Sequence, residues 1–236
     1  MSGNQKLLRD CIVEGIGAFF LMSLKFGVKI PMLGEVSLQD SIFEYALVIG
    51  LLIWVGQAIS GAYYFSSITI MSMFNKSLEV KKGLWYLLAQ AIGVLLASLY
   101  YFYSYVDNKS RKRNKPYPFT TQYINPQGKF LIRFIFLEFT STLFFAMFVA
   151  AFKTYKQCPD AMVAPLVGLS YAAFSNAISK ATGGFLDFFF YIFPALIWGK
   201  INSFVIVFAV GPPLGAICGY FLFNLIFTSP KGQSSD

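Results

Sequence analysis

The chain has 236 residues, of which 56% are hydrophobic and only 13% are charged. A soluble domain carries about 25% charged residues, so this chain has about half the polar surface that water would require. Its mean hydropathy is +0.60. Together with six long apolar runs, this composition excludes a soluble globular protein and indicates an integral, multi-pass membrane protein.

The six apolar runs are candidate membrane spans, because a helix needs about 20 residues to cross the hydrocarbon core. In chain order they cover residues 7–28, 42–59, 84–105, 130–152, 161–178 and 201–227. Two shorter apolar segments, 65–74 and 187–198, follow the breaks at Ser60-Gly61 and Gly183-Gly184. Short apolar segments beside full spans are typical of re-entrant half-helices, the alternative being kinked extensions of their neighbours.

The chemistry of most enzymes is missing from this composition. The sequence contains no histidine and three isolated cysteines, Cys11, Cys158 and Cys218. Without histidine there is no imidazole base, no histidine metal ligand and no Ser-His or Cys-His nucleophile pair. The cysteines form neither a CxxC motif nor a disulfide framework. We therefore expect no enzyme activity, no catalytic residue, no metal and no cofactor.

The net charge of +8 is concentrated near the ends of the apolar runs and in one loop. Basic residues at such places favour anionic lipid headgroups over nucleic acid as partners. The loop at 106–129 carries Lys109, Arg111, Lys112, Arg113 and Lys115. We expect it to contact anionic headgroups or an acidic subunit surface, the alternative being a solvated loop. Counting basic residues by side places Lys25 on the face opposite the termini, and this count leaves the orientation open.

The chain reads as one membrane domain built from two related halves. A repeat at about 7–105 precedes the basic loop, a second repeat covers about 130–227, and residues 228–236 form a polar tail. Glu14 corresponds to Glu138 in the second half. Each third span carries a row of small residues at spacing four, which lets helices approach closely in a membrane. These rows are Ala89, Gly93 and Ala97, and Gly211, Gly215 and Gly219.

Three spans per half is an odd number, so the second half must enter the membrane from the opposite face. This predicts an inverted repeat in which the two half-helices meet near the midplane. Their N-termini, each with a partial positive charge, then face each other. In a conducting protein that point lies on the pore.

Eight motifs resemble those of the aquaporin, or major intrinsic protein, family, and together they cover nearly the whole chain. They are Glu14-Gly15-Ile16-Gly17-Ala18, Glu138-Phe139-Thr140-Ser141-Thr142, Ile59-Ser60-Gly61-Ala62, Ala89-Gln90-Ala91-Ile92-Gly93, Ala164-Pro165-Leu166-Val167-Gly168-Leu169, Thr182-Gly183-Gly184, Phe193-Pro194-Ala195-Leu196 and Val210-Gly211-Pro212-Pro213-Leu214-Gly215-Ala216. The resemblance implies an all-α bundle of six transmembrane helices plus two re-entrant half-helices. It also implies that Glu14 and Glu138 brace the re-entrant loops by accepting backbone N–H bonds.

The pore motifs of that family are replaced. Where the family has Asn-Pro-Ala, this chain has Phe65-Ser66-Ser67 and Asp187-Phe188-Phe189. The family's asparagines cap the half-helices and offer amide donors to water. Phe65 can do neither, whereas Asp187 can still cap a helix, and we favour that role over an ion site.

The outer constriction also departs from the family. By the resemblance, its four positions fall on Tyr45, Ser175, Gly184 and Phe190. The family nearly always has arginine at the fourth position, where it supplies hydrogen-bond donors and a positive field. Phe190 supplies neither.

Two functions are compatible with these replacements. The one we favour from sequence is an aquaporin-like protein that has lost water transport and serves as an accessory subunit of a larger membrane complex. The mitochondrial inner membrane is then a candidate compartment. The alternative is an unorthodox channel for water, glycerol or another small neutral solute.

Overall fold

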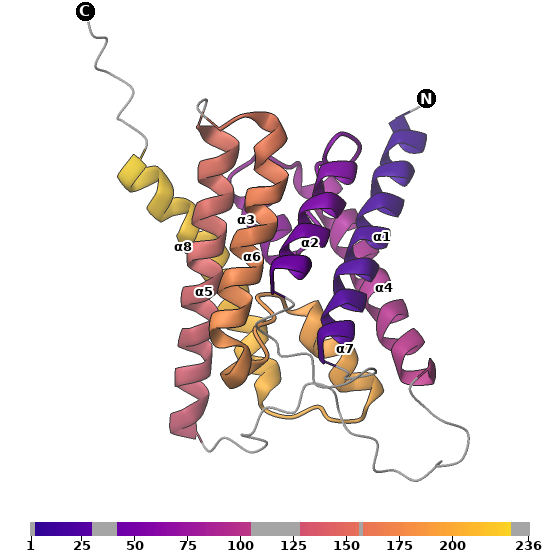
Figure 1. The fold of residues 1–236 in the computed structure, drawn as a ribbon, viewed down its shortest axis with the longest axis vertical. Helices are drawn as coiled ribbons and strands as arrows, with labels where there is room; N and C mark the ends of the chain where they lie inside the picture. The colour runs from indigo at the N-terminus through magenta and orange to yellow at the C-terminus, as the bar shows by residue number, and fades with distance from the viewer. Residues whose placement is uncertain (1–2, 30–41, 105–127, 156–157, 228–236) are drawn as a thin grey trace, which may run out of the picture.

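The structure, a computed structural model, describes residues 3–29, 42–104, 128–155 and 158–227. These residues form helices joined by turns and loops, with no strand among them. Figure 1 shows a bundle in which the first helix begins and the last helix ends at the same end of the molecule. The helices are α1 (Gly3–Lys29), α2 (Ile42–Gln57), α3 (Ser66–Phe74), α4 (Val80–Ser104), α5 (Gly128–Thr154), α6 (Asp160–Thr182), α7 (Phe189–Ile197) and α8 (Phe204–Phe227).

The predicted all-α bundle of six long helices and two half-helices is confirmed. By length and composition alone, α4, α5, α6 and α8 are long and apolar enough to cross a membrane. The apolar part of α2 is shorter, covering Phe43–Gln57. The charged residues of α1, among them Asp10, Glu14 and Lys25, lower its hydropathy. The two half-helices, α3 and α7, have nine residues each, too few to span.

The helix ends differ from the sequence prediction by a few residues, for local reasons. α2 ends at Gln57 because the chain turns there, with the amides of Ile59 and Ser60 donating to the Gly56 carbonyl. α6 continues to Thr182, where Gly183 adopts a left-handed conformation that ends the helix. α7 begins at Phe189 instead of at residue 187.

The inverted repeat is visible in the backbone that leads into each half-helix. Three positions in the first loop and the three corresponding positions in the second loop have positive φ. Two of these three pairs include a residue other than glycine, for which positive φ is unfavourable. Such residues persist only where the surroundings fix them. The pairs are Gly61 (96°) and Gly183 (91°), Ala62 (48°) and Gly184 (61°), and Tyr64 (45°) and Leu186 (54°).

The small-residue rows lie where the helices of each half touch. In the first half, α4 packs against α1, and a Cβ on Gly93 would lie 2.1 Å from the carbonyl oxygen of Gly15. In the second half, α8 packs against α5, and a Cβ on Gly215 would lie 2.3 Å from the carbonyl oxygen of Phe139. Backbone therefore meets backbone at both crossings, which only glycine permits at such a distance.

We predict that Gly93→Ala destabilises the bundle by about 1–3 kcal/mol, because the new methyl group forces α1 and α4 apart. The matched control is Gly3→Ala in α1, where an added Cβ meets nothing within 4 Å. Thermal unfolding of the purified protein in detergent would measure both variants. A Gly93→Ala variant that melts no lower than Gly3→Ala would contradict this packing.

Candidate functional site

Asp187 lies where the N-termini of the two half-helices meet, and it is fully buried. One carboxylate oxygen, Oδ1, accepts hydrogen bonds from the amides of Phe189 (2.8 Å) and Phe190 (3.3 Å) at the start of α7. The other, Oδ2, accepts from the amide of Ser66 and from its hydroxyl (2.8 Å) at the start of α3. A single carboxylate thus faces the positive ends of both helices.

Phe65 holds the matching position before α3 and cannot cap that helix. No side chain at this position bonds to the first turn of α3, so Asp187 of the other half supplies the acceptor. The Phe65 ring packs among other aromatic rings. Its centroid lies 4.5 Å from that of Tyr171, 5.5 Å from that of Phe145 and 6.0 Å from that of Phe190.

Glu14, in α1, lies behind the loop that leads into α3. Its carboxylate accepts bonds from the Ser60 hydroxyl (2.6 Å) and from the amides of Tyr63 (3.0 Å) and Tyr64 (2.7 Å). Gln90 of α4 donates to the same carboxylate at 2.9 Å. These bonds hold the loop in its left-handed conformation.

Glu138, in α5, has the corresponding place behind the second loop. Its carboxylate accepts bonds from the Thr182 hydroxyl and from the Leu186 amide (3.0 Å). The Thr182 oxygen in turn accepts from the Gly184 amide at 3.2 Å. Both carboxylates are fully buried and have the geometry that the resemblance implies for loop bracing.

The carbonyl oxygens of the second loop also have donors from within the protein. In a conducting pore such carbonyls would be free to accept bonds from a passing solute. The pairs are Gly184 O with Ser175 Oγ (2.5 Å) and Lys25 Nζ, Phe185 O with Tyr171 OH (3.0 Å), and Leu186 O with Ser67 Oγ (2.9 Å). A solute would have to compete with these internal donors.

The four predicted filter positions lie on three helices, α2, α6 and α7, and on the loop between α6 and α7. Ser175 and Gly184 are in direct contact through the hydrogen bond just described. The Phe190 ring is buried, and Tyr45 is half-buried with its ring 6.1 Å from that of Tyr171. Phe190 points to the aromatic cluster around Phe65, so it closes this region.

Lys25, which the count of basic residues placed on the side opposite the termini, is buried inside the bundle near the end of α1. Its side chain is 4% exposed, and Nζ donates to Ser175 Oγ at 2.8 Å and to the Gly184 carbonyl. The sequence carried a signal for this position. Lys25 follows the buried residues Leu21 and Met22 by four and three positions, the spacing of one helix face.

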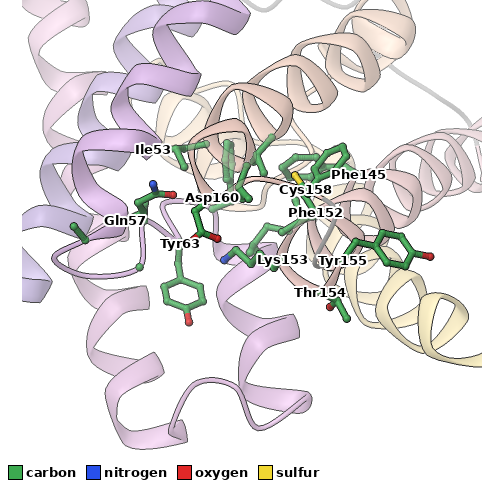
Figure 2. A pocket seen from close by; sticks show the side chains of 18 residues that line it. Ile53, Gln57, Tyr63, Phe145, Phe152, Lys153, Thr154, Tyr155, Cys158 and Asp160 are labelled. Atoms are coloured by element: carbon green, nitrogen blue, oxygen red, sulfur yellow. The ribbon is translucent and has the colours of Figure 1, made fainter. Parts of the chain in front are cut away.

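A cavity of about 690 Å³ opens between the ends of α2 and α5 and the start of α6. Figure 1 shows the end of α5 and the start of α6 at the end of the bundle where α1 begins. Figure 2 labels Lys153, Tyr63 and Asp160 among the residues that line this cavity. Phe65, Ile68 and Phe145 also line it, on the side of the bundle centre.

The centre of the bundle is closed in this conformation. Phe65, Tyr171 and Phe190 are 2%, 0% and 1% exposed, and the Phe65 ring packs against the other two. Aromatic rings give a file of water molecules few hydrogen-bond partners. Passage would therefore require these rings to move. The basic residues from Lys109 to Lys115 lie outside the described residues.

The chain is similar in sequence to members of a known family. A family profile described as "Major intrinsic protein" matches residues 1–223. "Probable aquaporin-5" of Gibberella zeae is 26% identical over 192 residues, which are 78% of this chain but only 32% of the fungal protein. "Aquaporin NIP1-1" of Zea mays is 22% identical over 93% of this chain and 75% of the maize protein.

A solved structure shows the same fold. The aquaglyceroporin from Plasmodium falciparum superposes with a TM-score of 0.74, covering 93% of this chain and 95% of its own. The sequence identity is 16%, so this likeness speaks for the fold alone.

We predict that Asp187→Ala lowers the free energy of unfolding by several kcal/mol. It leaves three backbone amides without an acceptor, and each buried orphan costs about 1–3 kcal/mol. The free energy of unfolding of Asp187→Asn should lie between those of the original chain and Asp187→Ala, because the single carbonyl oxygen of asparagine can serve only one half-helix. Asp160→Ala, at an exposed aspartate in the first turn of α6, is the control for thermal unfolding. Equal melting temperatures for the variants of both residues would refute the bridging role.

Proposed function

Because the chain belongs to the major intrinsic protein family, we propose that it is a membrane channel for a small neutral solute such as water or glycerol. The pathway follows the line on which α3 and α7 meet. The observation that carries this proposal is the match of the family profile over residues 1–223. It is supported by the fold of an aquaglyceroporin over nearly all of both chains.

The side chains that would hold the re-entrant loops and half-helices in place around such a pathway make their expected hydrogen bonds. Glu14 and Glu138 hold the two re-entrant loops, and Asp187 holds the two half-helices together. The cavity at the end of the bundle that carries the termini leads inward as far as Phe65. Beyond Phe65, its ring packs against that of Phe190, one of the predicted filter positions, with 6.0 Å between the centroids.

The lining of that section favours a neutral solute over an ion. The rings of Phe65, Tyr171 and Phe190 cannot replace the hydration shell of an ion. The nearby carboxylate of Asp187 is engaged by both half-helices and is fully buried. The conformation described here is the closed one, and the rings must turn aside for a solute to pass.

A second candidate is the accessory subunit without transport activity. Two observations favour it, the buried aromatic section and the internal donors on the loop carbonyls. It would keep the braced frame as a scaffold for other subunits of a membrane complex. The relatives in the comparisons are named as aquaporins, which supports the channel over this alternative.

Reconstitution tests the proposal directly. Liposomes that contain the purified full-length chain are mixed with a hyperosmotic solution of sucrose or glycerol, and their volume is followed by light scattering. The channel predicts faster water efflux or glycerol entry than in protein-free liposomes. Rates equal to those of empty liposomes, for both water and glycerol, would favour the accessory subunit.

We predict that Phe190→Ala raises water or glycerol permeability several-fold, because it removes one of the rings that close the centre. The backbone bond from residue 190 to Asp187 does not depend on the side chain. The truncation costs about 3–5 kcal/mol of stability, so the variant must first be shown to be monodisperse in detergent. Phe148→Ala, at a more exposed phenylalanine of α5, is the control. A folded Phe190→Ala protein as slow as this control would place the barrier elsewhere.

A further inference from the structure

We propose that the cavity between α2, α5 and α6 binds an apolar zwitterion, of the class of phenylalanine and other aromatic α-amino acids. Two opposite charges, Lys153 and Asp160, lie on the exposed part of its wall, and buried aromatic and aliphatic side chains form its inner end. This binding goes beyond the channel proposal and does not depend on it.

The cavity has the size and the lining of a site for a small organic molecule. Its volume is about 690 Å³, and ligand pockets typically have about 300–1,000 Å³. Its inner end is formed by Phe65, Ile68 and Phe145, all of which are buried. Pockets of this kind combine a mostly apolar wall with a few polar groups that fix the orientation of the ligand. The apolar part of a ligand therefore belongs at the inner end.

Lys153 and Asp160 place opposite charges on the outer part of the wall. Lys153 lies in the last turn of α5 and Asp160 in the first turn of α6, and both are exposed. Figure 2 shows the ends of these two side chains pointing toward each other beside Tyr63. No other described residue that lines the cavity carries a full charge at neutral pH. A ligand that enters here therefore meets one cation and one anion.

Neither charge is neutralised by the part of the chain that the structure describes. Within it, Lys153 and Asp160 form no ion pair and no side-chain hydrogen bond, with each other or with another residue. The Lys153 amine lies over the ring of Tyr63, 5.0 Å from the ring centroid. A ring face attracts a cation but accepts no conventional hydrogen bond from it. The three N–H donors of the amine are thus free to bind a ligand.

The surrounding structure fixes the place of both groups. The amide of Tyr63 donates to the Glu14 carboxylate at 3.0 Å, so the loop that carries the ring beneath the amine is held by α1. α5 ends at Thr154, α6 begins at Asp160, and the two helices pack against each other. The two charges therefore stay on the same side of the cavity.

An α-amino acid matches this arrangement of charges. Its carboxylate would accept hydrogen bonds from the Lys153 amine, and its ammonium group would donate to the Asp160 carboxylate. Charge-assisted hydrogen bonds are about twice as strong as neutral ones. Both groups of the ligand are attached to one carbon atom, which suits two side chains that point toward each other. An aromatic side chain would then extend inward to Phe145 and Val149 and bury its apolar surface there.

A ligand with a single charge fits this opening less well. An apolar carboxylate that binds Lys153 would face the carboxylate of Asp160, and an apolar amine that binds Asp160 would face the amine of Lys153. Like charges brought together oppose binding. The alternative is that the two residues only stabilise helix ends, because a lysine in the last turn and an aspartate in the first turn are both favourable there.

Equilibrium dialysis with tritiated phenylalanine tests the site on the full-length chain in phospholipid nanodiscs, each variant being first shown to be monodisperse by gel filtration. We expect saturable binding to the original chain and at least tenfold weaker binding to Lys153→Met and to Asp160→Asn. Val163→Phe, which narrows the cavity and keeps both charges, should also weaken binding. Lys180→Met is the matched control, because it removes an exposed lysine of α6 that does not line the cavity.

Ligands that lack one charge separate a binding site from a role at the helix ends. Tritiated 3-phenylpropionate, which has no ammonium group, should bind Asp160→Asn more tightly than the original chain, because the opposing carboxylate is gone. Phenethylamine, which has no carboxylate, should prefer Lys153→Met for the corresponding reason. A role confined to the helix ends would lower the melting temperature of these variants without producing either preference.

Absence of saturable phenylalanine binding to the original chain would overturn the proposal. Equal binding to the original chain and to both charge variants would overturn it as well, and so would glycine that competes as strongly as phenylalanine, since the apolar wall is then irrelevant. Failure of the channel proposal is detected separately, by water and glycerol flux into liposomes, and leaves the result of this dialysis unchanged.

Discussion

The carboxylate of Asp187 is the interaction on which the arrangement of the two halves depends. Each half-helix points its N-terminus at the bundle centre, where water cannot satisfy the free amides. In the second half, Asp187 accepts from the amides of its own helix. In the first half, Phe65 stands at the matching position and its side chain has no acceptor, so Asp187 accepts from Ser66 as well. One side chain thereby serves two helices and joins the two halves of the repeat.

The sharing of Asp187 by both half-helices changes which groups lie at the centre of the bundle, but leaves the arrangement of the helices unchanged. A carboxylate presents acceptors to both helix ends, and all of its bonds are made within the protein. The space that a second capping group would occupy is filled by the Phe65 ring, which packs on Tyr171 and Phe145. Polar groups that remain near the filter, above all Lys25 and the Gly184 carbonyl, bond to each other. The result is an aquaporin-like fold whose centre is filled by apolar rings, with one buried lysine beside them.

The sequence predicted the frame because periodicity and internal repetition are properties of the chain itself. The six spans, the two half-helices and the positions of Glu14 and Glu138 follow from apolar run lengths and repeated motifs. The sharing of Asp187 could not be predicted, because it depends on the distance between two loops 121 positions apart. The burial of Lys25 was not predicted, because a charge near the end of a span is usually drawn to the membrane surface. Its spacing from Leu21 and Met22, which puts all three on one face of α1, was the signal in the sequence that this side chain is buried.

Amide hydrogen exchange is the most direct test of the bridge that Asp187 forms. Mass spectrometry of the detergent-solubilised chain would follow peptides that cover the starts of α3 and α7, in the original protein and in Asp187→Ala. The bridge predicts that both segments, which are far apart in sequence, lose protection together when this one side chain is removed. Loss of protection at α7 alone, with the amide of Ser66 as protected as before, would show that Asp187 caps only its own helix.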